Sequence, residues 1–222
     1  MKDIFWSKLI EDSKNLEEPV LYQDYFDTPF ITEEDVFSLF NDVKAIQDNG
    51  FQDFRIYKGK GESKNFAYEL FSTPATGRQN MQEWLHGYFG DQKFGIVVNK
   101  AEKYCESIAR KLARFASPVF DHYPFPQYSS EIVIFIGNYG YTPLGIHYDF
   151  DYTRVLHFPI GPNDKKIIVW NEEENIKRIT NGNLQYFCPE NEIDELVTLY
   201  GQSYLLRKND LFLLPAQRYH IG

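Results

Sequence analysis

The second half of the chain is a succession of short apolar segments separated by turn residues, and this pattern limits the fold more than any other feature. Turn residues lie between the segments: Gly161-Pro162-Asn163-Asp164, Asn181-Gly182-Asn183 and Lys208-Asn209-Asp210. Short strands spaced in this way are typical of an antiparallel barrel or jelly roll. The segments of strand length span residues 131–136, 154–160, 166–170, 203–207 and 211–214.

The first part of the chain has helical patterns instead. Apolar residues recur at helical spacing in 3–14, 78–87 and 101–116, and Thr32-Glu33-Glu34-Asp35 predicts the start of another helix. Residues 19–22 predict a short edge strand. A chain of 222 residues has the length of one large domain. We therefore predict a single α+β domain over 1–222, mainly β, with a helical N-terminal part and edge strands at 1–128 and a barrel core at 129–222.

Charge and composition argue against several classes of protein. The net charge of −9 argues against a partner nucleic acid, because binding a phosphate backbone requires clustered Lys and Arg. No signal peptide and no apolar stretch long enough to span a membrane are recognisable, so we expect a cytoplasmic protein with no membrane partner. Cys105 and Cys188 have neither metal-site spacing nor a disulfide framework.

The segment Tyr141-Thr142-Pro143-Leu144-Gly145-Ile146-His147-Tyr148-Asp149 contains the most informative motif. Residues two apart in a strand point to the same face, so His147 and Asp149 can direct an imidazole and a carboxylate to one point. His220, which follows an apolar strand and a turn, is the candidate third ligand. Two histidines and one carboxylate leave open positions on a metal, as a non-haem Fe(II) oxygenase requires. Taken alone, His147 is also compatible with a hydrogen-bonded core histidine.

In this context the chain resembles the JmjC and cupin-like oxygenases, which include asparaginyl and ribosomal-protein hydroxylases. The likeness covers residues 135–222, with His147 and Asp149 after a glycine-containing turn and His220 after Asn209-Asp210-Leu211-Phe212-Leu213-Leu214-Pro215. It implies a double-stranded β-helix (jelly-roll) barrel in which His147, Asp149 and His220 bind Fe(II). It also implies 2-oxoglutarate as co-substrate and hydroxylation of a C–H bond in a protein, peptide or amino-acid substrate. Relatives are often homodimers, and the oligomeric state here stays open.

The resemblance implies a lysine that binds the distal carboxylate of 2-oxoglutarate, on the strand after the His-x-Asp. Lys165 and Lys166 both occupy that place, and strand alternation allows only one of them to face inward. We favour Lys165, which requires that Ile167 and Val169 face inward as well.

A hydroxyl donor is expected beside that lysine, because a buried carboxylate needs partners that offset its desolvation. Thr142 resembles the family's hydroxyl partner, and Tyr139 and Asn138 are substitutes. His157 lies an even number of residues after His147 and Asp149, so with continued strand alternation its side chain would face the same side as theirs. It is either a packed core histidine or a group in the metal cavity: a donor behind the ligands, a substrate contact or an extra ligand.

Two other functions remain compatible with the sequence: a cupin metalloenzyme that does not use 2-oxoglutarate, and a non-catalytic cupin-fold binding module. A closed barrel usually has a further strand beyond the distal histidine. Either the chain continues past Gly222 or the N-terminal part fills that position.

Overall fold

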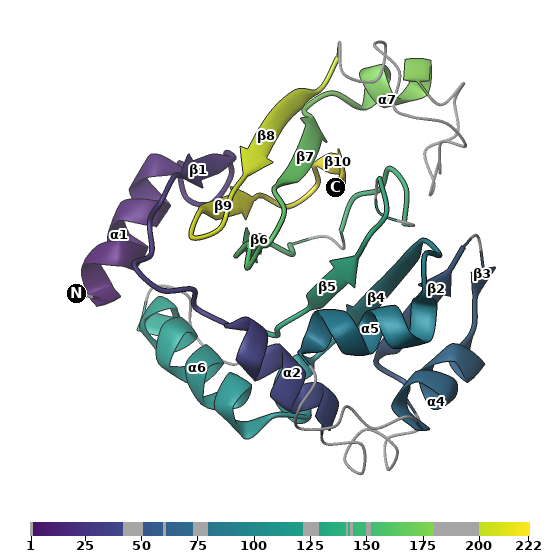
Figure 1. The fold of residues 1–222 in the computed structure, drawn as a ribbon. Helices are drawn as coiled ribbons and strands as arrows, with labels where there is room; N and C mark the ends of the chain where they lie inside the picture. Colours follow the sequence, from purple (N-terminus) through teal and green to yellow (C-terminus); the bar gives the residue numbers. More distant parts are fainter. Residues whose placement is uncertain are drawn as a thin grey trace. The chain divides into compact units, whose positions relative to one another are not determined.

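The computed structural model describes residues 2–41, 51–59, 61–72, 80–121, 129–140, 142, 144–149, 152–179 and 200–222. These residues form two compact units, one made of Asp3–Phe30 with Gly140–Gly222 and the other of Ile31–Tyr139. The fold combines helices with several antiparallel sheets, and none of these sheets closes into a barrel within the described ranges (Figure 1). The mixed helix and sheet class is thus confirmed. The division of a single domain at residue 129 stays a prediction.

The first unit contains the predicted C-terminal strands together with the N-terminal helix. The strands at 154–160, 166–170, 203–207 and 211–214 are confirmed, with ends shifted by a few residues. The elements are α1 (Lys2–Asp12), β1 (Val20–Tyr22), β6 (Val155–His157), β7 (Lys165–Trp170), α7 (Glu173–Ile179), β8 (Gln202–Leu206), β9 (Leu211–Leu214) and β10 (Tyr219–Ile221).

These strands form two three-stranded antiparallel sheets, with the orders β1-β9-β6 and β10-β7-β8. The two sheets share a core in which Ile167 and Val169 of β7 pack with Phe212 and Leu214 of β9. Alternate residues of a strand point to one face, so the same side of β7 that carries Ile167 and Val169 also carries Lys165. The predicted edge strand at 19–22 is confirmed, because β1 pairs only with β9 among the described strands.

The Asn209-Asp210 pair forms the turn that starts β9. Asn209 has a φ of 73°, which a short polar side chain tolerates at a tight turn. The buried Asp210 carboxylate accepts hydrogen bonds from the backbone N–H of Arg207 (2.7 Å) and of Asp24 (2.8 Å). This motif therefore fixes the turn between β8 and β9 and ties it to the N-terminal segment.

The second unit holds a four-stranded antiparallel sheet of order β3-β2-β4-β5 and most of the helices. Strands β2, β3 and β4 and helix α4 were not expected, although the apolar, β-branched run at β4 has the composition of a strand. The elements are α2 (Glu33–Asn41), β2 (Phe54–Lys58), β3 (Gly61–Glu62), α4 (Lys64–Ser72), α5 (Met81–Phe89), β4 (Phe94–Val98), η1 (Ala101–Lys103), α6 (Glu106–Ala116), η2 (Ser117–Asp121) and β5 (Ile134–Gly137).

Other predicted elements also have different limits in the structure, and the helix expected over 78–87 is α5, Met81–Phe89. The helix expected over 101–116 divides into η1 and α6, because Cys105 has an extended backbone (φ −143°, ψ 115°) and precedes α6 as its N-cap. The strand expected at 131–136 begins at Ile134. His220, expected after a turn, lies on a short strand of its own, β10.

The helix start predicted at Thr32 is confirmed, and it links two helices of the second unit. The Thr32 Oγ1 accepts a hydrogen bond from the Asp35 N–H (3.2 Å), and Asp35 Oδ2 accepts from both the N–H and the hydroxyl of Thr32 (2.8 Å each). Ser107 donates to Asp35 Oδ1 (3.0 Å), and Lys111 forms an ion pair with the same carboxylate. Asp35 therefore joins the first turn of α2 to α6.

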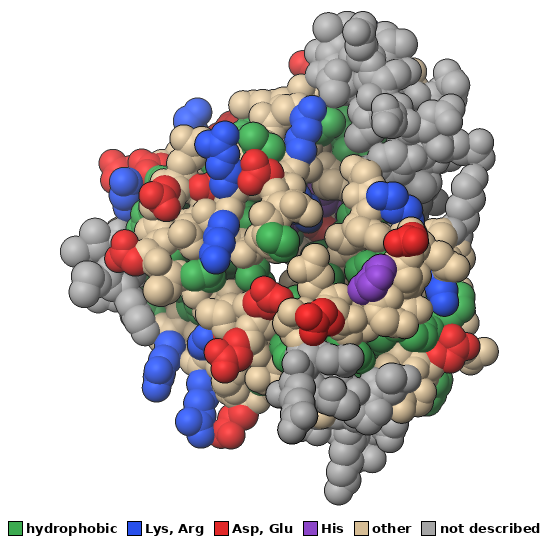
Figure 2. Space-filling model, in the orientation of Figure 1, with side chains coloured by type: hydrophobic (Ala, Val, Ile, Leu, Met, Phe, Trp, Pro, Cys, Tyr) green, Lys and Arg blue, Asp and Glu red, His purple; other side chains and the backbone are tan. Residues whose placement is uncertain are grey.

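The charged side chains on the face drawn in Figure 2 are intermixed, with Lys and Arg next to Asp and Glu. None of the helices in the described part of the chain is long and apolar enough to cross a membrane. The turn predicted at Asn181-Gly182-Asn183 and the second cysteine, Cys188, lie outside the described residues.

Candidate metal centre

His147 and His220 are brought together by an antiparallel bridge between their backbones. The N–H of His147 donates to the carbonyl of His220 (3.1 Å), and the N–H of His220 donates to the carbonyl of His147 (2.7 Å). Residues directly opposite in an antiparallel pair project their side chains to the same face. The two imidazoles accordingly lie with their centroids 4.3 Å apart, although 73 positions separate them in the sequence.

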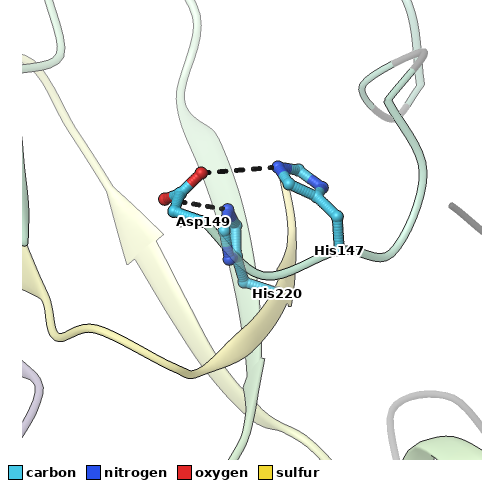
Figure 3. Close-up of side chains that lie close together, drawn as sticks. All are labelled: His147, Asp149 and His220. Carbon is cyan, nitrogen blue, oxygen red and sulfur yellow. Dashed lines mark ion pairs between the residues drawn. The ribbon is translucent and has the colours of Figure 1, made fainter. Parts of the chain in front are cut away.

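Asp149 completes the cluster, as the His-x-Asp spacing predicts. Its Oδ1 lies 4.0 Å from His147 Nε2 and its Oδ2 lies 4.0 Å from His220 Nε2. One potential ligand atom from each of the three residues lies within 4.8 Å of the other two (Figure 3). Ligands at ~2.0–2.2 Å from one cation are about 3–3.6 Å apart when they are neighbours and about 4.0–4.4 Å apart when they are opposite, so small shifts of these side chains would let them share an ion. The three residues could therefore hold a metal.

Backbone carbonyls orient both histidines. His147 Nδ1 donates to the carbonyl of Gly145 (2.8 Å), and His220 Nδ1 donates to the carbonyl of Arg218 (3.1 Å). A proton held on Nδ1 leaves the Nε2 lone pair available, and both Nε2 atoms face Asp149. The two carbonyls, each two residues before its histidine, were not anticipated. For the carbonyl of residue 145, the sequence signal was the glycine itself, which has a φ of 70° in the structure.

The environment favours the neutral, metal-binding form of His220. The residue is buried, and this burial, with the neighbouring His147, lowers the pKa of His220 to about 4. Asp149 is the most accessible of the three, with 33% of its side chain exposed against 12% for His147 and 9% for His220. A molecule from solvent would therefore reach the cluster on the side of Asp149.

Lys165 faces inward and Lys166 is exposed. This agrees with the sequence analysis, which favoured Lys165 over Lys166 as the inward-facing lysine. Val169, on the same face of β7 as Lys165, pairs directly with His220 of β10. A Cβ on Gly222 would lie 2.7 Å from Lys165 Cε and 3.2 Å from its Nζ, so the amino group occupies space that this glycine leaves open. Burial lowers the pKa of Lys165.

Thr142 also borders Gly222. Its backbone N–H donates to the carbonyl of Gly222, and its side chain is buried. The Thr142 hydroxyl has no hydrogen-bond partner within the described part of the chain. Gly222, which the sequence did not single out, therefore lies next to both Lys165 and Thr142, and the lysine's amino group fits there because the residue lacks a side chain.

The two substitutes for Thr142, Asn138 and Tyr139, belong to the second unit. Asn138 Oδ1 accepts from the N–H of Phe94 (2.8 Å), and Asn138 Nδ2 donates to the carbonyl of Gln92 (3.1 Å). The Tyr139 ring packs where a side chain on Gly137 would otherwise lie. Asn138 thus has a structural part in the turn that follows β5, and Thr142 is the candidate hydroxyl donor in the first unit.

His157 lies on β6, opposite Phe212 of β9, and its ring stacks on that phenyl ring with centroids 5.8 Å apart. Its Nε2 is excluded from solvent and has no hydrogen-bond partner among the residues described. Burial, and then the charge of Lys165, lower the pKa of His157 well below its ordinary value, so the imidazole is neutral at pH 7. In the described part of the chain, His157 is not one of the clustered potential metal ligands.

Comparison of the sequence with models of known protein families finds no match, and a search of curated proteins finds no similar sequence.

Proposed function

We propose that this protein is an Fe(II)- and 2-oxoglutarate-dependent oxygenase of the JmjC and cupin-like kind. In this proposal it hydroxylates a C–H bond of a protein, peptide or amino-acid substrate. The observation that carries the proposal is the convergence of two imidazole Nε2 atoms on one carboxylate, from His147, His220 and Asp149. The inward-facing Lys165 on the adjacent strand supports it.

The ligand set favours iron(II) over a structural metal. Two imidazoles and one carboxylate form the triad typical of non-haem Fe(II) oxygenases, in which the remaining positions stay open for co-substrate and dioxygen. Structural zinc sites instead have four protein ligands. Within the described residues this cluster contains three, His147, Asp149 and His220.

The arrangement of strands supports a double-stranded β-helix for the first unit. Jelly rolls consist of two antiparallel sheets that face each other across a core. Here the sheets β1-β9-β6 and β10-β7-β8 share the core around Phe212, and the backbone bridge at His147 extends the second sheet beyond β10. The metal ligands and Lys165 then lie on the inner face of that second sheet.

The residues of the chain would divide the binding of the co-substrate between them. His147, Asp149 and His220 hold the metal, while Lys165 and Thr142 bind the distal carboxylate of 2-oxoglutarate beside Gly222. A lysine ammonium and a hydroxyl donor offset the desolvation of that carboxylate. With iron and 2-oxoglutarate bound, dioxygen would be the oxidant for C–H hydroxylation: one of its oxygen atoms would enter the substrate, and the other the succinate that forms as 2-oxoglutarate loses carbon dioxide. The protein's own contribution is the orientation of these groups and the placement of the substrate on the accessible side of Asp149.

The net charge of the chain bears on the class of substrate. The net charge of −9 favours a basic protein or peptide over an acidic one, because opposite charges increase the rate of encounter.

Anaerobic titration with Fe(II) and then with 2-oxoglutarate tests the proposal. We expect one iron per chain, followed by a metal-to-ligand charge-transfer band as the keto acid chelates the metal. In the Asp149→Ala variant we expect iron affinity to fall by more than ~100-fold, because loss of a direct ligand should exceed the 10–100-fold cost of losing an outer-shell partner. Turnover of 2-oxoglutarate to succinate should then stop. Asp91→Ala is the matched control, since Asp91 is exposed in the turn after α5.

Two results would contradict the proposal and indicate another function. Iron bound at the cluster without a charge-transfer band would indicate a metalloenzyme that does not use 2-oxoglutarate. Failure to bind iron, cobalt or manganese stoichiometrically would indicate a binding module without catalysis. A separate result, equal turnover by the wild type and by Asp149→Ala, would show that Asp149 is not a ligand of the metal.

A further inference from the structure

His157 is a buried polar group that the proposed metal chemistry does not use. Its Nε2 is enclosed by protein and lacks a hydrogen-bond partner within the described ranges. The surroundings are largely apolar, since the ring stacks on Phe212 and the facing sheets contribute Val155, Ile167 and Leu214 to the same core. Buried polar atoms are paired in nearly all native proteins, so an unpaired one calls for a ligand or another explanation.

The polar neighbours of His157 indicate what such a ligand would be. Lys165 lies on the same face of β7 as Ile167, which packs in the core with Phe212, the residue opposite His157. Burial, and then the charges of Lys165 and His220, lower the pKa of His157. The Lys165 amino group lies against Gly222, whose carbonyl accepts a hydrogen bond from Thr142. The Thr142 hydroxyl is another buried polar atom of the first unit that lacks a partner among the described residues. A cation, a hydroxyl and a neutral imidazole therefore border the same part of the first unit.

These three groups together suit a carboxylate. An ionised carboxylate offers about four acceptor sites on two oxygens, whereas a lysine ammonium, a hydroxyl and an imidazole N–H are all donors. A cation compensates the charge of a buried anion, and neutral donors bind its remaining lone pairs. A cationic ligand would be repelled by Lys165.

We propose that His157 is a co-substrate-binding residue, which donates from Nε2 to the distal carboxylate of a dicarboxylic acid that Lys165 also binds. The identification of that acid as 2-oxoglutarate rests on the proposed function, whereas the carboxylate site itself does not require the metal. His157 also supplies specificity, because a ligand without the distal carboxylate leaves its Nε2 unpaired.

Binding of glutarate to the metal-free full-length protein tests the carboxylate site. Glutarate has both carboxylates but lacks the keto oxygen that chelates a metal. His157→Phe keeps a ring that can stack on Phe212 but removes the donor, and His157→Leu removes it with a smaller side chain. His157→Gln is the matched rescue, since its amide nitrogen can reach the place of Nε2. Calorimetry gives the dissociation constant, and thermal unfolding without ligand gives the stability of each variant.

We expect glutarate to bind the wild type saturably, and to bind His157→Phe and His157→Leu at least tenfold more weakly. His157→Gln should recover most of the affinity. The ligand-free His157→Phe or His157→Leu protein should be at least as thermostable as the wild type, because each variant removes a buried unpaired polar atom. In the iron-loaded protein, loss of the donor should raise KM for 2-oxoglutarate more than it lowers kcat.

A purely structural role for His157 gives the opposite pattern. The Phe and Leu variants would then both lose thermostability while binding glutarate as the wild type does, and that result overturns the inference. Absence of saturable glutarate binding by the wild type also overturns it. Glutarate binding that depends on His157, in a protein whose iron form shows no charge-transfer band, would contradict the oxygenase and leave the carboxylate site intact.

Discussion

Replacing Gly222 with alanine tests whether the space next to this residue positions Lys165 for the co-substrate. The new Cβ would lie 2.7 Å from Lys165 Cε and 3.2 Å from Nζ. Carbon atoms in ordinary contact are ~3.5–4.0 Å apart, so the lysine end must withdraw by about 1 Å. A misplacement of ~1 Å can cost on the order of 100-fold in rate. Loss of one hydrogen bond to a charged group costs ~1.5–3 kcal/mol, which corresponds to a factor of about 10–150.

We therefore expect Gly222→Ala to weaken binding of 2-oxoglutarate by roughly 10- to 100-fold. Stability should change by less than ~1 kcal/mol, because the displaced atoms are the flexible end of a lysine. The control is Gly140→Ala, since a Cβ at Gly140 has no described atom within 4 Å.

Titration of the anaerobic iron protein with 2-oxoglutarate gives both dissociation constants, and urea unfolding gives both stabilities. If Gly222→Ala and Gly140→Ala bind the keto acid equally well, then Lys165 does not hold the co-substrate beside Gly222. A large loss of stability in Gly222→Ala would show that the chain cannot adapt there, and the binding result would then lose its meaning as a test of Lys165.

Two further predictions concern Lys165 and Asp35. Lys165→Met should weaken 2-oxoglutarate binding at least tenfold in the same titration, whereas Lys166→Met should not, because Lys166 is exposed; equal effects would refute the inward orientation of Lys165. Hydrogen bonds from Lys111, Thr32 and Ser107 outweigh the effect of burial and lower the pKa of Asp35 from 3.8 to about 2. The pKa is lower in the folded state, so this carboxylate stabilises the fold fully above about pH 4, and the contribution disappears as the pH falls towards 2. Asp35→Asn should lose about 2 kcal/mol in urea unfolding at pH 7 and much less at pH 2.5; a constant difference between these pH values would contradict the linkage.

The sequence by itself determined the local directions of side chains. The His-x-Asp spacing places His147 and Asp149 on one side of an extended segment, since side chains alternate along a strand whatever surrounds it. Turn residues such as Asn209 and Asp210 likewise marked the ends of strands, because their short polar side chains stabilise turns. These features depend on neighbouring residues only, and for that reason most strands of the first unit could be predicted.

The structure alone decided which distant segments meet. The pairing of His147 with His220 depends on the register of an antiparallel bridge between segments 73 positions apart. The register of β10 against β7 places Val169 opposite His220, and this puts Lys165 rather than Lys166 on the face of the metal ligands. A shift of one residue would reverse that choice. Register follows from how the two sheets bury Phe212 and its neighbours, a property of the whole unit that no single segment encodes.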